Sequence, residues 1–252
     1  MNTAEPATLI PRHLRTDLHL HSTFSDGRAG VPTMVAAAQR AGFQIAISDH
    51  YSIPYGMRGD EALSRYLDAL EQYTIYRAVE LDLGNEQPMS AENRARLDYC
   101  VGSLHSVLGE DGTQLRPDRY SPESMRRYMD TAVAQIVRGF HSGLHRMIGH
   151  PTFLPELPHQ GQAELWEPHY RRAVIEAALE SGVALELSTR YPVPNPTLLR
   201  EALDAGVRFA VASDGHGPEA VGAISRARQL IEQFNIPADR FFLPERRLDA
   251  QT

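Results

Sequence analysis

The sequence predicts an α/β fold, a closed or nearly closed barrel of seven parallel strands, and three observations support it. Seven short apolar runs alternate with helix-like stretches along the chain. Three of those stretches end in glycine directly before the next apolar run, in AGF, SGV and AGV, which is typical of repeated β/α units. A length of 252 residues is also normal for a single barrel of this kind.

The seven expected strands are compact apolar runs, as parallel strands covered on both faces should be. They are residues 15–21, 44–50, 76–84, 98–106, 146–151, 183–188 and 208–216.

The expected helices lie between these runs and carry recognisable ends. The first begins with Pro32 in its opening turn and ends at Gly42. The longest begins with Ser121 and Pro122, an N-cap and first-turn pair, and ends near Gly139. The expected helices are 31–42, 59–73, 90–98, 121–140, 167–182, 196–206 and 217–234, and residues 52–60 and 151–168 are expected loops.

No linker or shift of composition divides the chain. We therefore expect residues 1–252 to form a single domain, with a core over about 15–235 and peripheral tails at 1–13 and 243–252.

The composition limits the classes of function. A formal net charge of -7 makes a polynucleotide partner an unlikely expectation, because nucleic-acid-binding surfaces are usually basic. No window has the apolar length of a membrane span or a signal peptide, and the single cysteine permits no internal disulfide. A cytoplasmic protein is expected. All 25 basic residues are arginine, which excludes Schiff-base and lysine general-base chemistry.

Nine residues of metal-ligand type stand at or near the ends of the expected strands. Because the loops that follow parallel strands meet at one end of a barrel, these side chains are expected to converge. They are His19, His21, Asp26, His50, Glu80, His105, His150, Asp214 and His216.

The first strand carries the pattern H-x-H. His19 and His21 are two residues apart and therefore lie on the same face of a strand, where both can reach one ion. Asp26 follows in the loop SDG and can fold back toward them. Asp214 and His216 repeat the same spacing after the last strand.

Glu80 is an acid within an otherwise apolar strand. A buried carboxylate needs a cation, and a metal suits this position better than a salt bridge because the other candidates converge nearby. Asp82 shares its face and is expected to be a surface residue or a support for a ligand. Asp49, beside His50, either supports a ligating imidazole or caps the following turn.

The donor set indicates which ions would bind. His105 and His150 follow glycine-containing strand ends, where the backbone can pack closely around a site. Mixed nitrogen and oxygen donors, in a chain with one cysteine, favour Zn, Mn or Fe over a thiolate zinc site. The five other histidines are expected to be solvent-facing or supporting residues, namely His13, His141, His145, His159 and His169.

Taken in order, the motifs DLHLHSTFSDG, SDH, AVELD, GSLHS, IGHP and SDGH resemble those of the PHP (polymerase and histidinol phosphatase) family, from about residue 17 to 216. The resemblance implies a distorted seven-stranded barrel, three divalent metal ions and hydrolysis of phosphate esters. It implies one ion held by His19, His21, Glu80 and Asp214, a second held by His105, His150 and a bridging Glu80, and a third held by Asp26, His50 and His216. Some relatives have histidine where this chain has Asp26, which makes the third site richer in oxygen.

The expected activity is therefore that of a metal-dependent phosphatase acting on a small phosphomonoester, histidinol phosphate or a similar metabolite, through a metal-activated hydroxide. Glu80, Asp214 and Arg190 are the expected catalytic residues. Arg190 follows the sixth strand and is the candidate for binding the substrate phosphate, because a guanidinium matches phosphate bidentately. Arg58, in the loop after His50, is the weaker candidate.

Three alternatives are weighed against this expectation. A PHP-type nuclease would act on polynucleotide ends with the same ions. An amidohydrolase usually carries a lysine bridge between its metals, which this chain cannot supply. A metal-binding module without activity is the third, although the complete ligand set argues for an enzyme.

Overall fold

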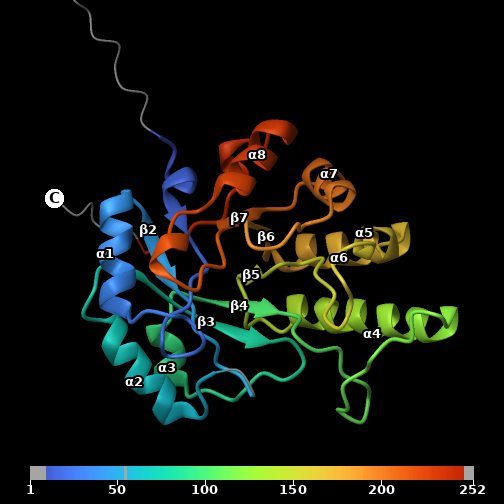
Figure 1. Ribbon diagram of the computed structural model, residues 1–252, viewed down its shortest axis with the longest axis horizontal. Helices are drawn as coiled ribbons and strands as arrows, with labels where there is room; N and C mark the ends of the chain where they lie inside the picture. The colour runs from blue at the N-terminus through green and yellow to red at the C-terminus, as the bar shows by residue number, and fades with distance from the viewer. Residues whose placement is uncertain (1–9, 54–55, 247–252) are drawn as a thin grey trace, which may run out of the picture.

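The computed structural model describes residues 10–53 and 56–246, and its strands form one parallel sheet in sequence order from β1 to β7 (Figure 1). Each strand pairs with the next in parallel, and each lies inside the run predicted for it. The strands are β1 (Thr16–Asp17), β2 (Gln44–Ile47), β3 (Tyr76–Asp82), β4 (Tyr99–Ser103), β5 (Met147–Ile148), β6 (Ala184–Ser188) and β7 (Phe209–Ala212).

The sheet curves until its first and last strands meet. The Leu18 amide donates to the Val211 carbonyl at 3.2 Å, and Leu20 forms a parallel bridge with Gly215. Because β1 and β5 have only two residues each, the barrel is irregular and nearly closed. The predicted fold class is confirmed.

The helices cover the outside of the strands, with α1 to α3 on one side and α4 to α6 on the other (Figure 1). Their bounds agree closely with the predicted helices in most cases. They are α1 (Val31–Ala41), α2 (Asp60–Leu70), α3 (Ala91–Arg96), α4 (Pro122–His141), α5 (Gln162–Leu165), α6 (Pro168–Ser181), α7 (Pro196–Ala205) and α8 (Ser225–Phe234). Within the described residues, none of these helices has the length and apolar character required to span a membrane.

Two local predictions were wrong. The single helix expected at 217–234 is divided into a 3₁₀ turn, Pro218–Ala220, and α8. Gly222 lies between them at φ +71°, and its amide donates to the Asp17 carboxylate at 3.0 Å, so a buried acid on β1 interrupts the helix. The short helix α5 also lies inside the segment 151–168, which was expected to be a loop.

The barrel has an outer and an inner apolar layer. Leu185 and Leu187 of β6 pack outward in the same cluster as residues of α4 and α6. The inner cluster includes several small side chains, such as Ala46, Ala78 and Ala184. It leaves room for polar groups further along the same strands.

Aromatic residues close the amino end of the barrel. Tyr76 and Tyr99 are the first residues of β3 and β4, and Phe242 packs edge-on against Tyr99 with ring centroids 5.6 Å apart. Arg246, within the predicted tail 243–252, donates to both carboxylate oxygens of Asp98 at 2.6 Å. The tail residues 1–9 and 247–252 lie outside the described residues. The carboxyl end of the barrel is thus the end where a site can form.

Candidate metal centre

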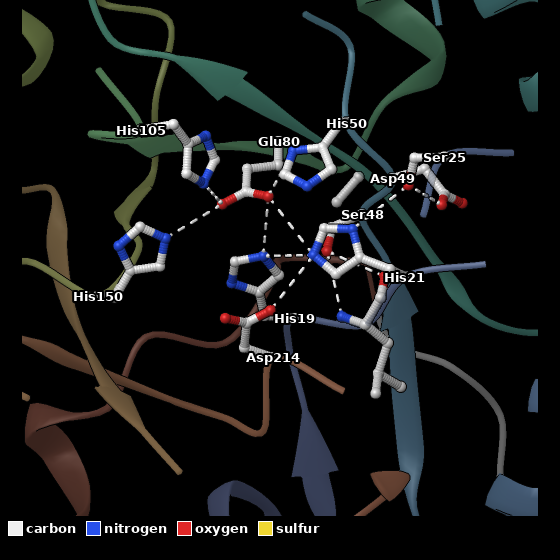
Figure 2. Close-up of polar contacts among 12 residues, drawn as sticks. His19, His21, Ser25, Ser48, Asp49, His50, Glu80, His105, His150 and Asp214 are labelled. Atoms are coloured by element: carbon white, nitrogen blue, oxygen red, sulfur yellow. Dashed lines mark hydrogen bonds and ion pairs between the residues drawn. The ribbon is translucent and has the colours of Figure 1, made fainter. Parts of the chain in front are cut away.

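Glu80 of β3 lies at the centre of a ring of imidazoles at the carboxyl end of the strands (Figure 2). Its Oε2 atom lies 3.4 Å from Nε2 of His19 and 3.4 Å from Nε2 of His21. The same oxygen lies 2.9 Å from Nδ1 of His50. Three residues from two separate loops therefore direct nitrogen atoms at one carboxylate oxygen.

The other oxygen of Glu80 has two histidine neighbours. Oε1 lies 3.5 Å from Nε2 of His105, which follows β4, and 3.6 Å from Nε2 of His150, which follows β5. The carboxylate consequently lies between two groups of imidazoles, as a ligand that bridges two ions would.

The surroundings of Glu80 fit divalent cations. Its side chain is 1% exposed, and neither carboxylate oxygen accepts a hydrogen bond from the described residues. Burial raises the pKa of this carboxyl, but His19 and His50 outweigh it and hold the pKa well below its usual range. Two ligands on one tetrahedral zinc lie about 3.3 Å apart, close to the nitrogen–oxygen distances found here.

A second cluster lies at the more exposed edge of the site around Asp26. Its Oδ2 atom lies 3.1 Å from Nε2 of His216 and 3.6 Å from Nε2 of His50, and its Oδ1 atom lies 3.5 Å from Nδ1 of His21. Burial raises the pKa of Asp26, yet the hydrogen bonds with His216 and His50 lower it far below normal. The carboxylate therefore stays ionised and available to a cation.

The clusters share members. Three groups of side chains bring one donor atom each to within 4.8 Å of one another. They are His21, Asp26, His50 and His216; His19, His21 and Glu80; and His50, Glu80 and His105. His21 and His50 each belong to two groups, so the sets are less separate than the family resemblance implies.

Asp214, just after β7, completes the inner cluster. Its Oδ1 atom lies 3.4 Å from Nε2 of His21. Burial raises its pKa, but His19 and His21 bring it down to about 2, so the group is a carboxylate at neutral pH.

Two of the nine residues have an unusual backbone conformation. Asp214 has φ 53° and His150 has φ 31°, values that are uncommon outside glycine. Strained residues of this kind concentrate at functional sites, where the surrounding structure holds them in place.

All nine predicted residues lie at the carboxyl end of the barrel, with side chains brought together from six strand ends.

The structure resolves the two roles considered for Asp49. Its carboxylate accepts from the Ser22 amide at 2.7 Å, from the Ser22 hydroxyl at 2.6 Å and from the Ser25 hydroxyl at 2.6 Å. Asp49 therefore caps the loop after β1. It does not cap the turn that follows Asp49 itself. Asp82, in contrast, contacts Nδ1 of His105 and supports that imidazole.

Sequence reasoning missed Glu186 on β6. This fully buried carboxylate contacts Nδ1 of His19 at 3.0 Å. The signal was available, since Glu186 is an acid within an apolar run in the same way as Glu80.

The prediction for the other histidines was wrong at two positions, because His13 and His145 are buried and lie apart from the clusters. His13 stacks on Phe241 with ring centroids 4.1 Å apart. Nδ1 of His145 donates to the Gly139 carbonyl at 3.0 Å. The remaining three, His141, His159 and His169, are exposed.

An open cavity of about 270 Å³ lies over the clusters. Phe153 and Tyr191 form one wall, with ring centroids 4.6 Å apart. Arg190 lines the cavity, and its Nη1 atom lies 2.6 Å from Nδ1 of His216. Arg58 is exposed and is not among the described residues that line the cavity. These are Asp26, His50, Glu80, His105, His150, Phe153, Pro155, Glu156, Arg190, Tyr191, Asp214 and His216.

Comparison with known proteins agrees with this site. Residues 17–190 match the sequence model of the PHP domain. A Deinococcus radiodurans protein named "Probable histidinol-phosphatase" is 27% identical over 240 residues, which cover 82% of this chain and 88% of the relative. A Clostridium acetobutylicum protein of the same name is 22% identical over 242 residues, covering 87% and 94%.

Two further matches have a more limited meaning. The Bacillus subtilis "DNA polymerase/3'-5' exonuclease PolX" is 30% identical over 109 residues, which cover 38% of this chain and 19% of that protein. The crystal structure of hisK from Listeria monocytogenes superimposes with a TM-score of 0.59 at 17% identity, covering 82% of this chain and 97% of that one. At that identity the superposition supports the fold alone.

Proposed function

The chain belongs to the PHP domain family, and we propose that it is a metal-dependent phosphoesterase that hydrolyses a small phosphomonoester, histidinol phosphate or a similar metabolite. The observation that carries the proposal is Glu80, a buried carboxylate with five imidazole nitrogens within 3.6 Å, none of them in hydrogen-bond geometry to its oxygens. A carboxylate buried among neutral imidazoles needs positive charge beside it, and divalent cations bound by the same imidazoles would provide that charge.

Nine residues would hold the ions, in the three sets that the family resemblance implies. A first ion would be held by His19, His21, Glu80 and Asp214, a second by Glu80, His105 and His150, and a third by Asp26, His50 and His216. Zn, Mn and Fe all suit this mixture of nitrogen and oxygen donors. The shared positions of His21 and His50 mean that neighbouring ions would compete for the same imidazoles.

When bound, divalent ions lower the pKa of water and neutralise charge on phosphoryl oxygens. The protein contributes the remaining interactions. Arg190 extends over the cavity next to His216 and Asp214, where its guanidinium can bind two phosphoryl oxygens at once. Arg190 would thereby orient the ester. Glu80 and Asp214 would provide negatively charged oxygen ligands for the ions.

The cavity wall would contact the organic part of the substrate. Phe153 and Tyr191 offer aromatic faces to a small apolar or planar group. The carboxylates of Asp26 and Glu156 line the same cavity, and their charge disfavours a polyanion such as a nucleic acid. The names of two relatives that match over most of their length, both "Probable histidinol-phosphatase", also support a phosphomonoester as the substrate.

The test is a screen for phosphate release. The purified chain is stripped with a chelator, reloaded separately with Mn, Zn and Fe, and assayed on histidinol phosphate, sugar phosphates, nucleoside monophosphates and a labelled oligonucleotide. We expect release of phosphate from at least one monoester and an intact oligonucleotide. Shortening of the oligonucleotide without monoester hydrolysis would identify a nuclease instead. Absence of both reactions with every ion would identify a non-catalytic module.

A further inference from the structure

Glu186 is, after Glu80, the second buried glutamate among the described residues, and neither the family resemblance nor the comparisons give it a role. It lies at the centre of β6, where all five residues are buried. Its neighbours Leu185 and Leu187 pack outward into the helical layer, so the alternation of the strand directs Glu186 toward the interior. A carboxylate in that position is stable only if polar groups meet it.

Both oxygens of Glu186 contact candidate ligand residues from other strands. Oε1 lies 3.0 Å from Nδ1 of His19, and Oε2 accepts the backbone amide of His150. The side chain is completely buried. Solvent therefore competes for neither contact.

The contact with His19 selects one form of its imidazole. Because a carboxylate only accepts, Nδ1 of His19 must carry a proton, and in the neutral imidazole that binds a metal Nε2 then presents its lone pair. That Nε2 atom lies 3.4 Å from Oε2 of Glu80 and 3.1 Å from Nε2 of His21. Glu186 thus turns the coordinating nitrogen of His19 toward the cluster.

The contact with His150 acts through the backbone. His150 has φ 31°, a conformation that costs free energy in a residue with a side chain. Its amide points at Glu186, and its Nε2 atom lies 3.6 Å from Oε1 of Glu80. The hydrogen bond therefore stabilises the turn that directs this imidazole at the other side of Glu80.

We propose that Glu186 is a positioning residue for two ions at once, holding His19 for the first and His150 for the second. This inference rests on the proposed function only for the presence of the ions. Asp82 provides a contrast, because it contacts the single imidazole of His105. Glu186 would instead couple occupation of two neighbouring sites through one carboxylate.

The decisive measurement is the number of ions bound by Glu186→Gln, without any substrate. The amide has one acceptor oxygen, so it cannot serve both His19 and His150. Loss of such a supporting group typically weakens metal affinity about 10–100-fold. At a free zinc concentration that just saturates the unchanged protein, we expect the variant to bind at least one ion fewer per chain by mass spectrometry. Glu201→Gln, which alters an ion pair with Arg171 outside the site, should bind the full number.

A folded Glu186→Gln variant with the full ion count would overturn the inference, as would an equal loss in the Glu201→Gln control. If Glu186→Gln does not fold, nitrogen NMR of the unchanged, zinc-loaded protein decides. His19, identified by the signal missing from His19→Asn, should carry its proton on Nδ1, and a proton on Nε2 would refute the assignment.

The proposed function fails separately. Failure to release phosphate from any monoester, together with the expected ion counts, would leave the role of Glu186 intact. An unchanged protein that binds no ion under any loading condition would overturn both.

Discussion

Two buried carboxylates at different places in the barrel have opposite surroundings. Asp17 lies at the seam between β1 and β7, where it accepts hydrogen bonds from the Ser213 amide at 2.9 Å, the Ser213 hydroxyl at 2.7 Å and the Gly222 amide at 3.0 Å. Glu80 accepts none from the described residues and faces imidazoles. The protein satisfies the first carboxylate by itself and leaves the second for an outside cation.

The pKa values of the two carboxyls shift in opposite directions. Burial raises the pKa of Asp17 to about 6, and the donors from Ser213 and Gly222 offset this only in part. Burial also raises the pKa of Glu80, but His19 and His50 lower it well below normal. Burial of an acid is thus no sign of function by itself. A deficit of hydrogen-bond donors, together with neighbouring metal-ligand side chains, is the better indicator.

The largest expected effect is that of Glu80→Ala. Removing the shared carboxylate should release two ions and lower kcat/KM for a phosphomonoester roughly a thousandfold, since several kcal/mol of transition-state stabilisation disappear. The two measurements are phosphate release and ion counting by mass spectrometry. Full activity in this variant would break the comparison, because Glu80 would then be a structural residue like Asp17.

Arg190→Ala should have the next largest effect. A charged hydrogen bond to phosphate contributes about 1.5–3 kcal/mol, so we expect KM for the phosphomonoester to rise roughly 10–100-fold with little change in the ion count. Steady-state kinetics measure this, with Arg190→Lys as the control that keeps the charge and loses the planar fork. Unchanged KM in Arg190→Ala would remove this residue from the site.

Asp17→Asn tests the other half of the comparison. One carboxamide oxygen must replace two carboxylate oxygens, and its NH₂ group would face donors, so we expect a loss of about 1–3 kcal/mol in the free energy of unfolding. Urea denaturation of the metal-free protein measures it. The ion count and kcat should stay unchanged; a lost ion with normal stability would mean that the seam is part of the site.

Arg246→Ala should have the smallest effect, at the amino end of the barrel. The Arg246 side chain is 36% exposed, so solvent screening limits its pairing with Asp98 to about 1 kcal/mol. We expect a melting temperature lower by a few degrees and normal phosphatase kinetics. A fall in kcat would indicate that the two ends of the barrel are coupled.

Much of the fold could be predicted because it depends on short-range patterns. Apolar runs, proline near helix starts and glycine at helix ends identified all seven strands and most helix bounds. The helix expected at 217–234 was wrong for a long-range reason, since the carboxylate of Asp17, far away in the sequence, holds Gly222 in a turn.

The candidate ligands were predictable because histidines and acids at the ends of parallel strands have few structural explanations. The residues that support the ligands were harder to predict from the sequence. Glu186 and Glu80 both look like acids in apolar strands, and Asp49 had two plausible partners, neither of which matched its bonds to Ser22 and Ser25.

The sequence by itself determined the order of strands and helices, the side chains that reach the carboxyl end and the family of motifs they form. Those properties follow from local periodicity and from the geometry of parallel strands. Only the tertiary structure decided which buried acids find donors, because a carboxylate is satisfied by groups from segments up to 205 positions away, as in Asp17 and Gly222.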